Sequence, residues 1–453
     1  MSVSSAKKTC CVLSLIVCLW FGVSPGIAAE ENKPGTGEVL TLQESIKTAL
    51  ENNPKIVSSA EEIKAAENVR KQARSEFLFK MRGSYSYTRL QETPTLQSFS
   101  IPGAPTELAI GTQDNFNLVL SAEQPVFAGF AILTNYQISE LGLDIAKIQL
   151  RTNRHNLIRD VTVSYFDIIL AEKRLIVAEE SVRQLESQVK RALDFFEVGM
   201  TPRNDYLKAD VELAQAKQEV IVGEGRLRLT KAQLNTLLRV QVNKPVQVED
   251  LLKYVPFEMT QDDAYQIAHK NRPELVETEL ALERAVKEVK LAQSGFYPNL
   301  LVNFTYERFG DTFEVHGSDF EEQETWYATA ALDWTFWEWG KTKYRVGEKK
   351  NRVKQAKEAL RAVQDSVDLE VKRAYVALRD AERNISVTEK AIEQAKENYR
   401  MEVERYKQQV NTNTDVLEAE TLVARSQNNY HETLYLYNTA LVELKRAMGV
   451  IEE

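Results

Sequence analysis

The chain has 453 residues, of which 43% are hydrophobic and 27% charged, and its formal net charge is −9. This length allows two or three ordinary domains, and the mildly negative charge argues against a nucleic-acid-binding protein, which needs a basic surface. The sequence contains no evident nucleophile cluster or phosphate-binding loop, and its histidines lack metal-ligand spacing, which argues against an enzyme; they are His155, His269, His316 and His431.

The first 29 residues are typical of a secretory signal peptide. They have a basic start, an apolar run over 11–22 and small residues up to Ala29 that offer a cleavage site. The apolar run is well short of the ~20 residues that span a bilayer, so an uncleaved anchor is the less favoured interpretation. All three cysteines lie in this segment, and bulky Val17 argues against lipid attachment at Cys18. The rest of the chain therefore contains no disulfide framework.

Two halves of the remaining sequence resemble each other. TLQESIKTALENNP, from Thr41, matches TQDDAYQIAHKNRP, from Thr260. The match continues through each half at the pairs Phe77/Phe296, Tyr87/Tyr306, Arg89/Arg308, Tyr165/Tyr375 and Asp205/Asp415. Copies of this size are too large for a solenoid repeat and indicate a duplicated unit with pseudo-symmetry.

Each copy predicts a short helix, a long helix, two strands, a very long helix, a tip and a second long helix. No linker rich in Pro, Gly or Ser separates the copies, so we expect one interlocked body. The predicted boundaries are a first repeat over 30–239, short strands and turns over 240–260, a second repeat over 261–450 and a tail over 451–453.

The predicted strands alternate apolar and polar residues and cover 82–93, 113–126, 300–309 and 324–336. In the first of them Tyr85 and Tyr87 face one way, and Ser84, Ser86 and Thr88 face the other. Strands of about ten residues with this alternation are typical of a transmembrane barrel. Tryptophans, which favour a membrane–water interface, lie on or just after the last strand, at Trp326, Trp334, Trp337 and Trp339. The alternative is a soluble amphipathic sheet, which would need a covering layer.

Four strands do not close a barrel, whereas three chains would contribute twelve, enough to leave a water-filled bore. The segments 94–112 and 310–323 are polar and fit the longer outer loops of such barrels. Since no later segment is apolar enough for a transmembrane helix, we expect strands to cross the membrane if this exported protein is integral to one.

The longest predicted helices cover 131–196 and 341–406, each with a heptad seam and a length of roughly 100 Å. Each turns at a tip and returns through a shorter heptad stretch. At the first tip Gly199 and Pro202 stop the helix, and Asn204 or Asp205 is the predicted cap of the returning helix. At the second tip the predicted cap is Thr414 or Asp415.

These features, in this order, resemble the TolC-like outer-membrane efflux protein family over residues 40–450. The motifs that carry the resemblance are Asn-Asn-Pro at 52–54, Asn-Arg-Pro at 271–273, Pro-Val-Phe-Ala-Gly at 125–129, and Asp-x-Leu-x-Ala at 205–209 and 415–419. The resemblance implies a mainly α protein with a membrane β-barrel. In a homotrimer, four strands per chain would form a 12-stranded β-barrel, and long antiparallel coiled-coil helices would form an α-barrel.

The resemblance also implies a location in the cell outer membrane, with most of the chain in the periplasm. The protein would be the exit duct of a tripartite efflux or type I secretion system. Its implied partners are two further copies of itself, a periplasmic adaptor, an inner-membrane transporter of the RND, ABC or MFS type, and outer-membrane lipid. No cofactor, metal or nucleic acid is implied. Cargo selection would lie in the transporter, so drugs, metal ions, solvents and polypeptides all remain candidates.

Family members place functional residues at the helix tips. The matching gate and lumen residues here are Asp205, Tyr406, Asn411, Asp415 and Glu418, and the matching adaptor-docking residues are Val198, Gly199, Met200, Pro202 and Val410. Asn411 stands where a known member has a latch arginine, and Gln409 stands where glycine is common. The alternative function is that of an exported coiled-coil adaptor or structural protein that does not conduct. Such an adaptor would have a single hairpin flanked by small β-domains.

Overall fold

The computed structural model describes residues 39–97 and 107–451, which belong to a single unit. The predicted signal peptide, with Cys18, lies outside the described residues. Among the residues that are described, no helix is both long and apolar enough to span a membrane.

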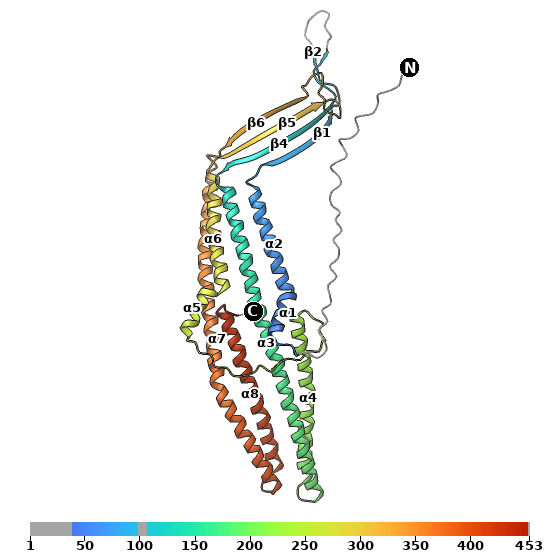
Figure 1. Cartoon of the computed structure of the whole chain (residues 1–453), viewed down its shortest axis with the longest axis vertical. Helices are drawn as coiled ribbons and strands as arrows, with labels where there is room; N and C mark the ends of the chain where they lie inside the picture. The colour runs from blue at the N-terminus through green and yellow to red at the C-terminus, as the bar shows by residue number, and fades with distance from the viewer. Residues whose placement is uncertain (1–38, 98–106, 452–453) are drawn as a thin grey trace, which may run out of the picture. The chain divides into compact units, whose positions relative to one another are not determined.

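The unit is built from two copies of one order of elements (Figure 1). The first copy contains α1 (Leu42–Asn52), α2 (Pro54–Ser75), β1 (Lys80–Arg89), β4 (Asp114–Ala128), α3 (Ala131–Glu197) and α4 (Arg203–Leu237). The second contains α5 (Gln261–Asn271), α6 (Pro273–Gln293), β5 (Asn299–Gly310), β6 (Glu324–Asp333), α7 (Lys341–Lys407) and α8 (Asn413–Ala447). The predicted duplication and element order are confirmed.

The two proline motifs divide the first helices of each copy. Pro54 and Pro273 are the first residues of α2 and α6, because proline lacks the N–H that an earlier helix would need there but fits the first helical turn. In the first copy Asn53 caps α2 by accepting a hydrogen bond from the Lys55 N–H at 3.0 Å. Its amide also donates to the Leu237 carbonyl at the end of α4, at 3.3 Å.

Arg272 takes the place of Asn53 in the second copy and is the buried member of a partly exposed charge cluster. Its side chain is 3% exposed, and it donates to the Arg446 carbonyl, near the end of α8, at 3.2 Å. Arg272 and Arg446 each pair with both Glu274 and Glu370, so two cations alternate with two anions. This cluster ties the start of α6 to α7 and α8.

The four long strands form one antiparallel sheet in the order β1-β4-β5-β6. The duplication is visible in its side chains, because Tyr87 donates to Asp114 at 2.8 Å and the matching Tyr306 donates to Glu324 at 2.6 Å. Each acid is the first residue of the strand that pairs with the tyrosine's strand.

Three details of the strand prediction are wrong. The strand predicted to reach residue 93 ends at Arg89, and part of the predicted loop 94–112 forms a ribbon of β2 (Thr95–Gln97) and β3 (Glu107–Ala109). Ribbon pairing places Leu96 opposite Leu108, a cross-strand contact that the loop's polar composition hides. The strand predicted to end at 336 ends at Asp333, since the chain then turns into α7 with Trp339 at a φ of 54°.

Both faces of the sheet's edge strands are exposed. Every residue of β1 is exposed, as are all but one of β6. In the described part of the chain the strands pack against one another and no helix layer covers them. A soluble sheet would bury one face against a second layer, so this arrangement contradicts the soluble alternative.

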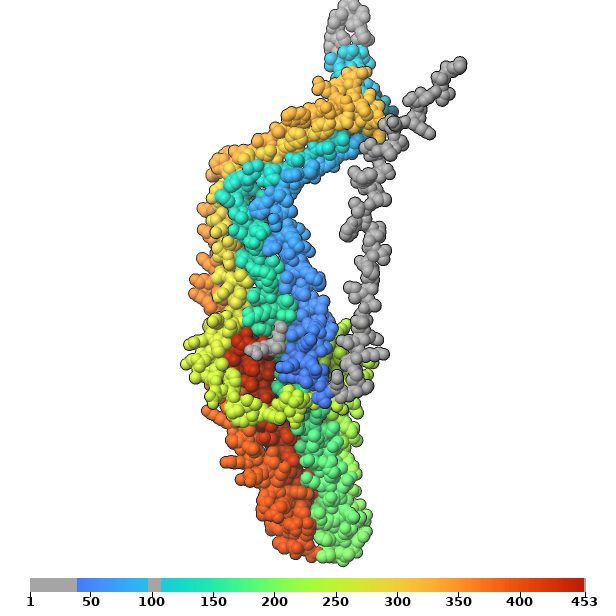
Figure 2. Space-filling model, in the orientation of Figure 1, coloured from blue at the N-terminus to red at the C-terminus, as the bar shows by residue number. Residues whose placement is uncertain are grey.

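The helices form two long hairpins, α3 with α4 and α7 with α8 (Figure 1). Space-filling representation shows the green and orange-red hairpins packed side by side down to their tips (Figure 2). The predicted ends of α3 and α7 are within one residue of those observed.

The inter-repeat segment wraps against both hairpins without forming the short strands that were predicted. Its only strand-like pairing among described residues is a single bridge from Val248 to Leu40. Two matching tyrosines of the repeats bind the inter-repeat segment by hydrogen bonds. Tyr165 accepts from the Glu249 N–H at 2.8 Å, and Tyr375 donates to the Met259 carbonyl at 3.1 Å. Hydrogen bonds to side chains thus replace the ladder that a strand would need.

Candidate functional site

The tip of the first hairpin ends α3 with a reversal at Gly199. Gly199 has a φ of 77°, and the Met200 N–H reaches the Phe195 carbonyl at 2.8 Å, which is the Schellman pattern of a helix end. Pro202 is the N-cap of α4. The predicted docking residues Val198 and Met200 are exposed at this tip, with Val198 at 68%.

The second tip repeats this reversal with glutamine in place of glycine. Gln409 has a φ of 58°, and the Val410 N–H reaches the Arg405 carbonyl at 2.9 Å. For a residue with a Cβ atom, this left-handed backbone conformation is less stable than the right-handed one by roughly 1–2 kcal/mol. Val410, the docking residue predicted here, is 67% exposed.

Exchanging these two residue types is expected to shift stability in opposite directions. Gln409→Gly removes backbone strain, partly offset by the greater freedom of glycine in the unfolded chain, and should stabilise the protein by about 0.5–1 kcal/mol. Gly199→Ala should destabilise it by a similar amount, since no atom lies within 4 Å of the added Cβ and only the backbone strain changes. Thermal unfolding followed by helical circular dichroism measures both. Stabilisation by both substitutions would contradict this account.

The predicted caps of the returning helices are wrong. In the described structure no side chain caps α4, because Asp205 is already the third residue of that helix. In α8 the cap is Thr412, and Asp415 is its partner in a capping box, where its carboxylate accepts from the Thr412 N–H at 2.8 Å. The hydroxyl and backbone N–H of Thr412 hold the pKa of Asp415 below its ordinary value, so this exposed acid keeps its charge.

Tyr406 lies in the interface between the two tips. It is 2% exposed, and its ring centroid lies 5.5 Å from that of Phe195 on α3. Burial raises the pKa of Tyr406, and the charge of Asp205 raises it further. The structure therefore brings these two predicted gate residues close together, through a contact between hairpins.

Asn413 is a second contact between the tips, and the sequence analysis missed it. This residue is fully buried; its amide donates to the Asp205 carbonyl at 2.8 Å and accepts from Gln188 of α3 at 2.6 Å. Nothing in its Asn/Thr-rich surroundings distinguishes it, since each neighbour is an equally plausible cap. Asn411 instead donates to Glu402 of its own hairpin, away from Asp205.

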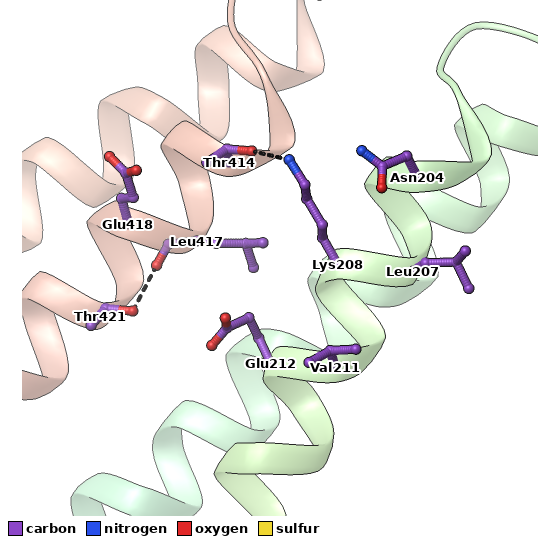
Figure 3. Close-up of a pocket in the computed structure, with 9 residues that line it drawn as sticks. All are labelled: Asn204, Leu207, Lys208, Val211, Glu212, Thr414, Leu417, Glu418 and Thr421. Carbon is purple, nitrogen blue, oxygen red and sulfur yellow. Dashed lines mark hydrogen bonds between the residues drawn. The ribbon is translucent and has the colours of Figure 1, made fainter.

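A groove of about 520 Å³ separates α4 from α8 near the tips (Figure 3). Lys208 reaches across it to the Thr414 hydroxyl at 3.3 Å. Glu418, a predicted lumen acid, lines the groove together with Glu212, and apolar side chains from both helices complete it: Leu207, Val211 and Leu417. Asp415 does not line this groove, so the two predicted ring acids have different surroundings within one chain.

The predicted interface aromatics gather at the two ends of the sheet. Trp326 lies near the start of β6 and stacks on Phe304 at a centroid distance of 6.0 Å; Tyr85 and Tyr87 are exposed on β1. The other tryptophans follow β6 at its opposite end and are exposed: Trp334, Trp337 and Trp339. At 3.4 Å per residue, Trp326 and Trp334 are roughly 27 Å apart along the chain, which is about 20 Å of height for a barrel strand tilted by about 40°, slightly less than the roughly 25 Å of a membrane barrel's apolar band.

Known proteins resemble the chain over most of its length. The family model described as Outer membrane efflux protein matches residues 45–238 and again 264–450. Outer membrane efflux protein BepC of Brucella suis is 21% identical over 84% of this chain and 79% of its own length. Alkaline protease secretion protein AprF of Pseudomonas aeruginosa is 23% identical, covering 91% and 85%. The outer membrane channel CmeC of Campylobacter jejuni shares the fold, with a TM-score of 0.78 at 16% identity over 90% of this chain and 85% of CmeC.

Proposed function

Because this chain belongs to the outer membrane efflux protein family, a non-enzymatic channel family whose members are trimers in tripartite systems, we propose that three copies of it form one duct. The duct would carry substrate from the periplasm or an inner-membrane transporter to the outside of the cell. It would perform no chemistry, and the transporter would supply the driving force.

The uncovered four-stranded sheet is the observation that carries this proposal. Its edge strands β1 and β6 present unpaired N–H and C=O groups, which call for pairing with another chain. Pairing β6 of one copy with β1 of the next, three times, closes a ring of twelve strands and leaves no edge. Lipid would then cover the exposed outer face, and the aromatic side chains at both ends of β6 would lie at the two membrane surfaces.

The hairpin tips supply a gate at the other end of the duct. Asp415 and Glu418 of three copies would place a ring of negative charge around a narrow axis, and Tyr406 with Asp205 would hold the second hairpin against the first. Opening would be an outward shift of α7 and α8, a change between two states that a bound adaptor biases.

Electrical recording of the purified protein tests the proposed function. Detergent-extracted protein should run as a heat-sensitive trimer on gels and should give stepwise single-channel currents in planar lipid films. A monomer that gives no current at any voltage would instead favour a non-conducting coiled-coil protein.

Adaptor docking at the tips is expected to be detectable by cysteine cross-linking. Since the chain after the predicted signal peptide has no cysteine, Val198→Cys, Met200→Cys and Val410→Cys each provide one reactive thiol. We expect each to capture the hairpin of a periplasmic adaptor, because these side chains are exposed at the reversals. Lys64→Cys on α2, also exposed, is the matched control. Capture at the control position and at none of the tips would reject docking there.

A further inference from the structure

The contact between the two hairpins includes a row of polar pairs between α3 and α8, beside apolar contacts such as that of Leu417 on α8 with Leu185 on α3. The residue numbers rise along α3 as they fall along α8, which is the register of two antiparallel helices. The pairs are Asn156–Arg446, Arg159–Glu443, Asp167–Tyr435, Arg174–Glu432, Glu180–Gln427, Ser181–Glu420 and Gln188–Asn413. We refer to these seven pairs as the α3–α8 seam.

The interior of the second hairpin is different, because apolar residues hold it together. Val367, Val371 and Leu378 of α7 pack with Leu434 and Leu444 of α8 in one buried cluster. Separating α7 from α8 would expose this large apolar cluster to water. Separating α3 from α8 breaks the polar pairs, which water can replace, and exposes the smaller apolar cluster around Leu185 and Leu417. The second hairpin is therefore built to move as a unit, with the α3–α8 seam as the surface that parts.

Glu420 is the exceptional member of the seam. It is 6% exposed, and none of the ion pairs between described residues includes it. Its hydrogen-bond partner is the Ser181 hydroxyl of α3. One turn closer to the tip, Leu417 joins an apolar cluster with Leu185 and Leu213. The carboxyl group of Glu420 therefore lies at the edge of an apolar contact between helices.

Within residues 39–97 and 107–451, the charged groups that act on this acid are themselves acidic. The groups that act on Glu420 are the carboxylates of Glu212 and Glu219 on α4 and the Ser181 hydroxyl on α3. Burial, and then the charge of Glu420, raise the pKa of Tyr399 on α7. Burial raises the pKa of Glu420 above its ordinary value of 4.5, the two α4 carboxylates raise it further, and Ser181 lowers it.

We propose that Glu420 is a proton-binding site in the α3–α8 seam, protonated while the hairpins are together and ionised when they part. This inference rests on the proposed function, since it presumes an opening at the tips. Burial disfavours the ionised form of Glu420 in the closed seam, and separation of the hairpins exposes its carboxylate to water. The closed state therefore gains stability below its pKa for Glu420 and loses that gain as pH rises through it, so alkaline conditions favour opening.

Conductance of the reconstituted protein as a function of pH tests this site. In the wild type the open fraction should fall as the pH is lowered toward 4.5, the ordinary pKa of this carboxyl, and each unit of pKa difference between the states changes the closed-to-open ratio about tenfold per chain. Glu420→Gln, which keeps the shape and has no proton to lose, should flatten the profile and favour closure at neutral pH. Glu393→Gln, an exposed acid on α7, should leave the profile unchanged.

A second variant distinguishes titration from a structural defect. Ser181→Ala removes the hydrogen bond that lowers the Glu420 pKa, so its profile should move to higher pH. Normal current with wild-type profiles in both Glu420→Gln and Ser181→Ala would overturn the proton site alone. A wild type that conducts at no pH would reject the proposed function and this inference together.

Discussion

The double variant Asp415→Asn with Glu418→Gln, carried by every copy of the chain, is expected to weaken divalent-cation block of the closed duct roughly ten- to a thousandfold. This is the range by which focused electric fields concentrate counter-ions. The two acids are exposed, and Asp415 stays ionised because Thr412 holds its pKa down. Three copies of each would place six negative charges around one axis, where a cation is attracted and anions are slowed. Neutralising them should also raise anion conductance relative to cation conductance.

The control for this double variant is Thr412→Ala. It breaks the capping box and should cost about 1 kcal/mol of stability, but it leaves both carboxylates charged. Cation block should therefore persist in Thr412→Ala and be lost in the double variant. Block is measured as the cation concentration that halves single-channel current. Equal block in the wild type and the double variant would show that the two acids do not face the conducting path.

Arg272→Ala is expected to destabilise the protein by about 2–3 kcal/mol, less than the roughly 3–5 kcal/mol of a fully buried charge pair, because the carboxylates it leaves behind are 26% and 39% exposed. Arg272 is almost fully buried and pairs with both Glu274 and Glu370. Without it, two carboxylates would share Arg446 alone. The end of α8 would also lose the hydrogen bond that Arg272 donates to it.

Arg361→Ala is the matched control, since Arg361 is exposed on α7 and pairs with Glu358 within one turn. Such surface pairs contribute about 0–1 kcal/mol. Chemical unfolding of the protein in detergent, followed by circular dichroism, measures both variants. Similar losses in the two would show that the charge cluster contributes no more than a surface pair.

The sequence was sufficient for the helices and the four long strands because their signals are local. Proline at 54 and 273 begins a helix wherever it falls in such a motif, and Gly199 marks the end of a long heptad stretch. The internal repeat then extended each assignment from one half to the other. Gln409 is an exception, because it adopts the left-handed backbone conformation of Gly199 at the matching tip, and no glycine in the sequence indicates it.

The partners of these elements were decided only by the tertiary structure. Which residue caps α8, how Arg272 joins Glu370, and where Asn413 and Glu420 are buried depend on the register between helices far apart in the chain. Heptad spacing fixes which face of a helix is apolar, but not which turn of another helix lies opposite it. The α3–α8 seam is therefore invisible in the sequence, although all of its residues except Asn413 lie on helices that the sequence predicts.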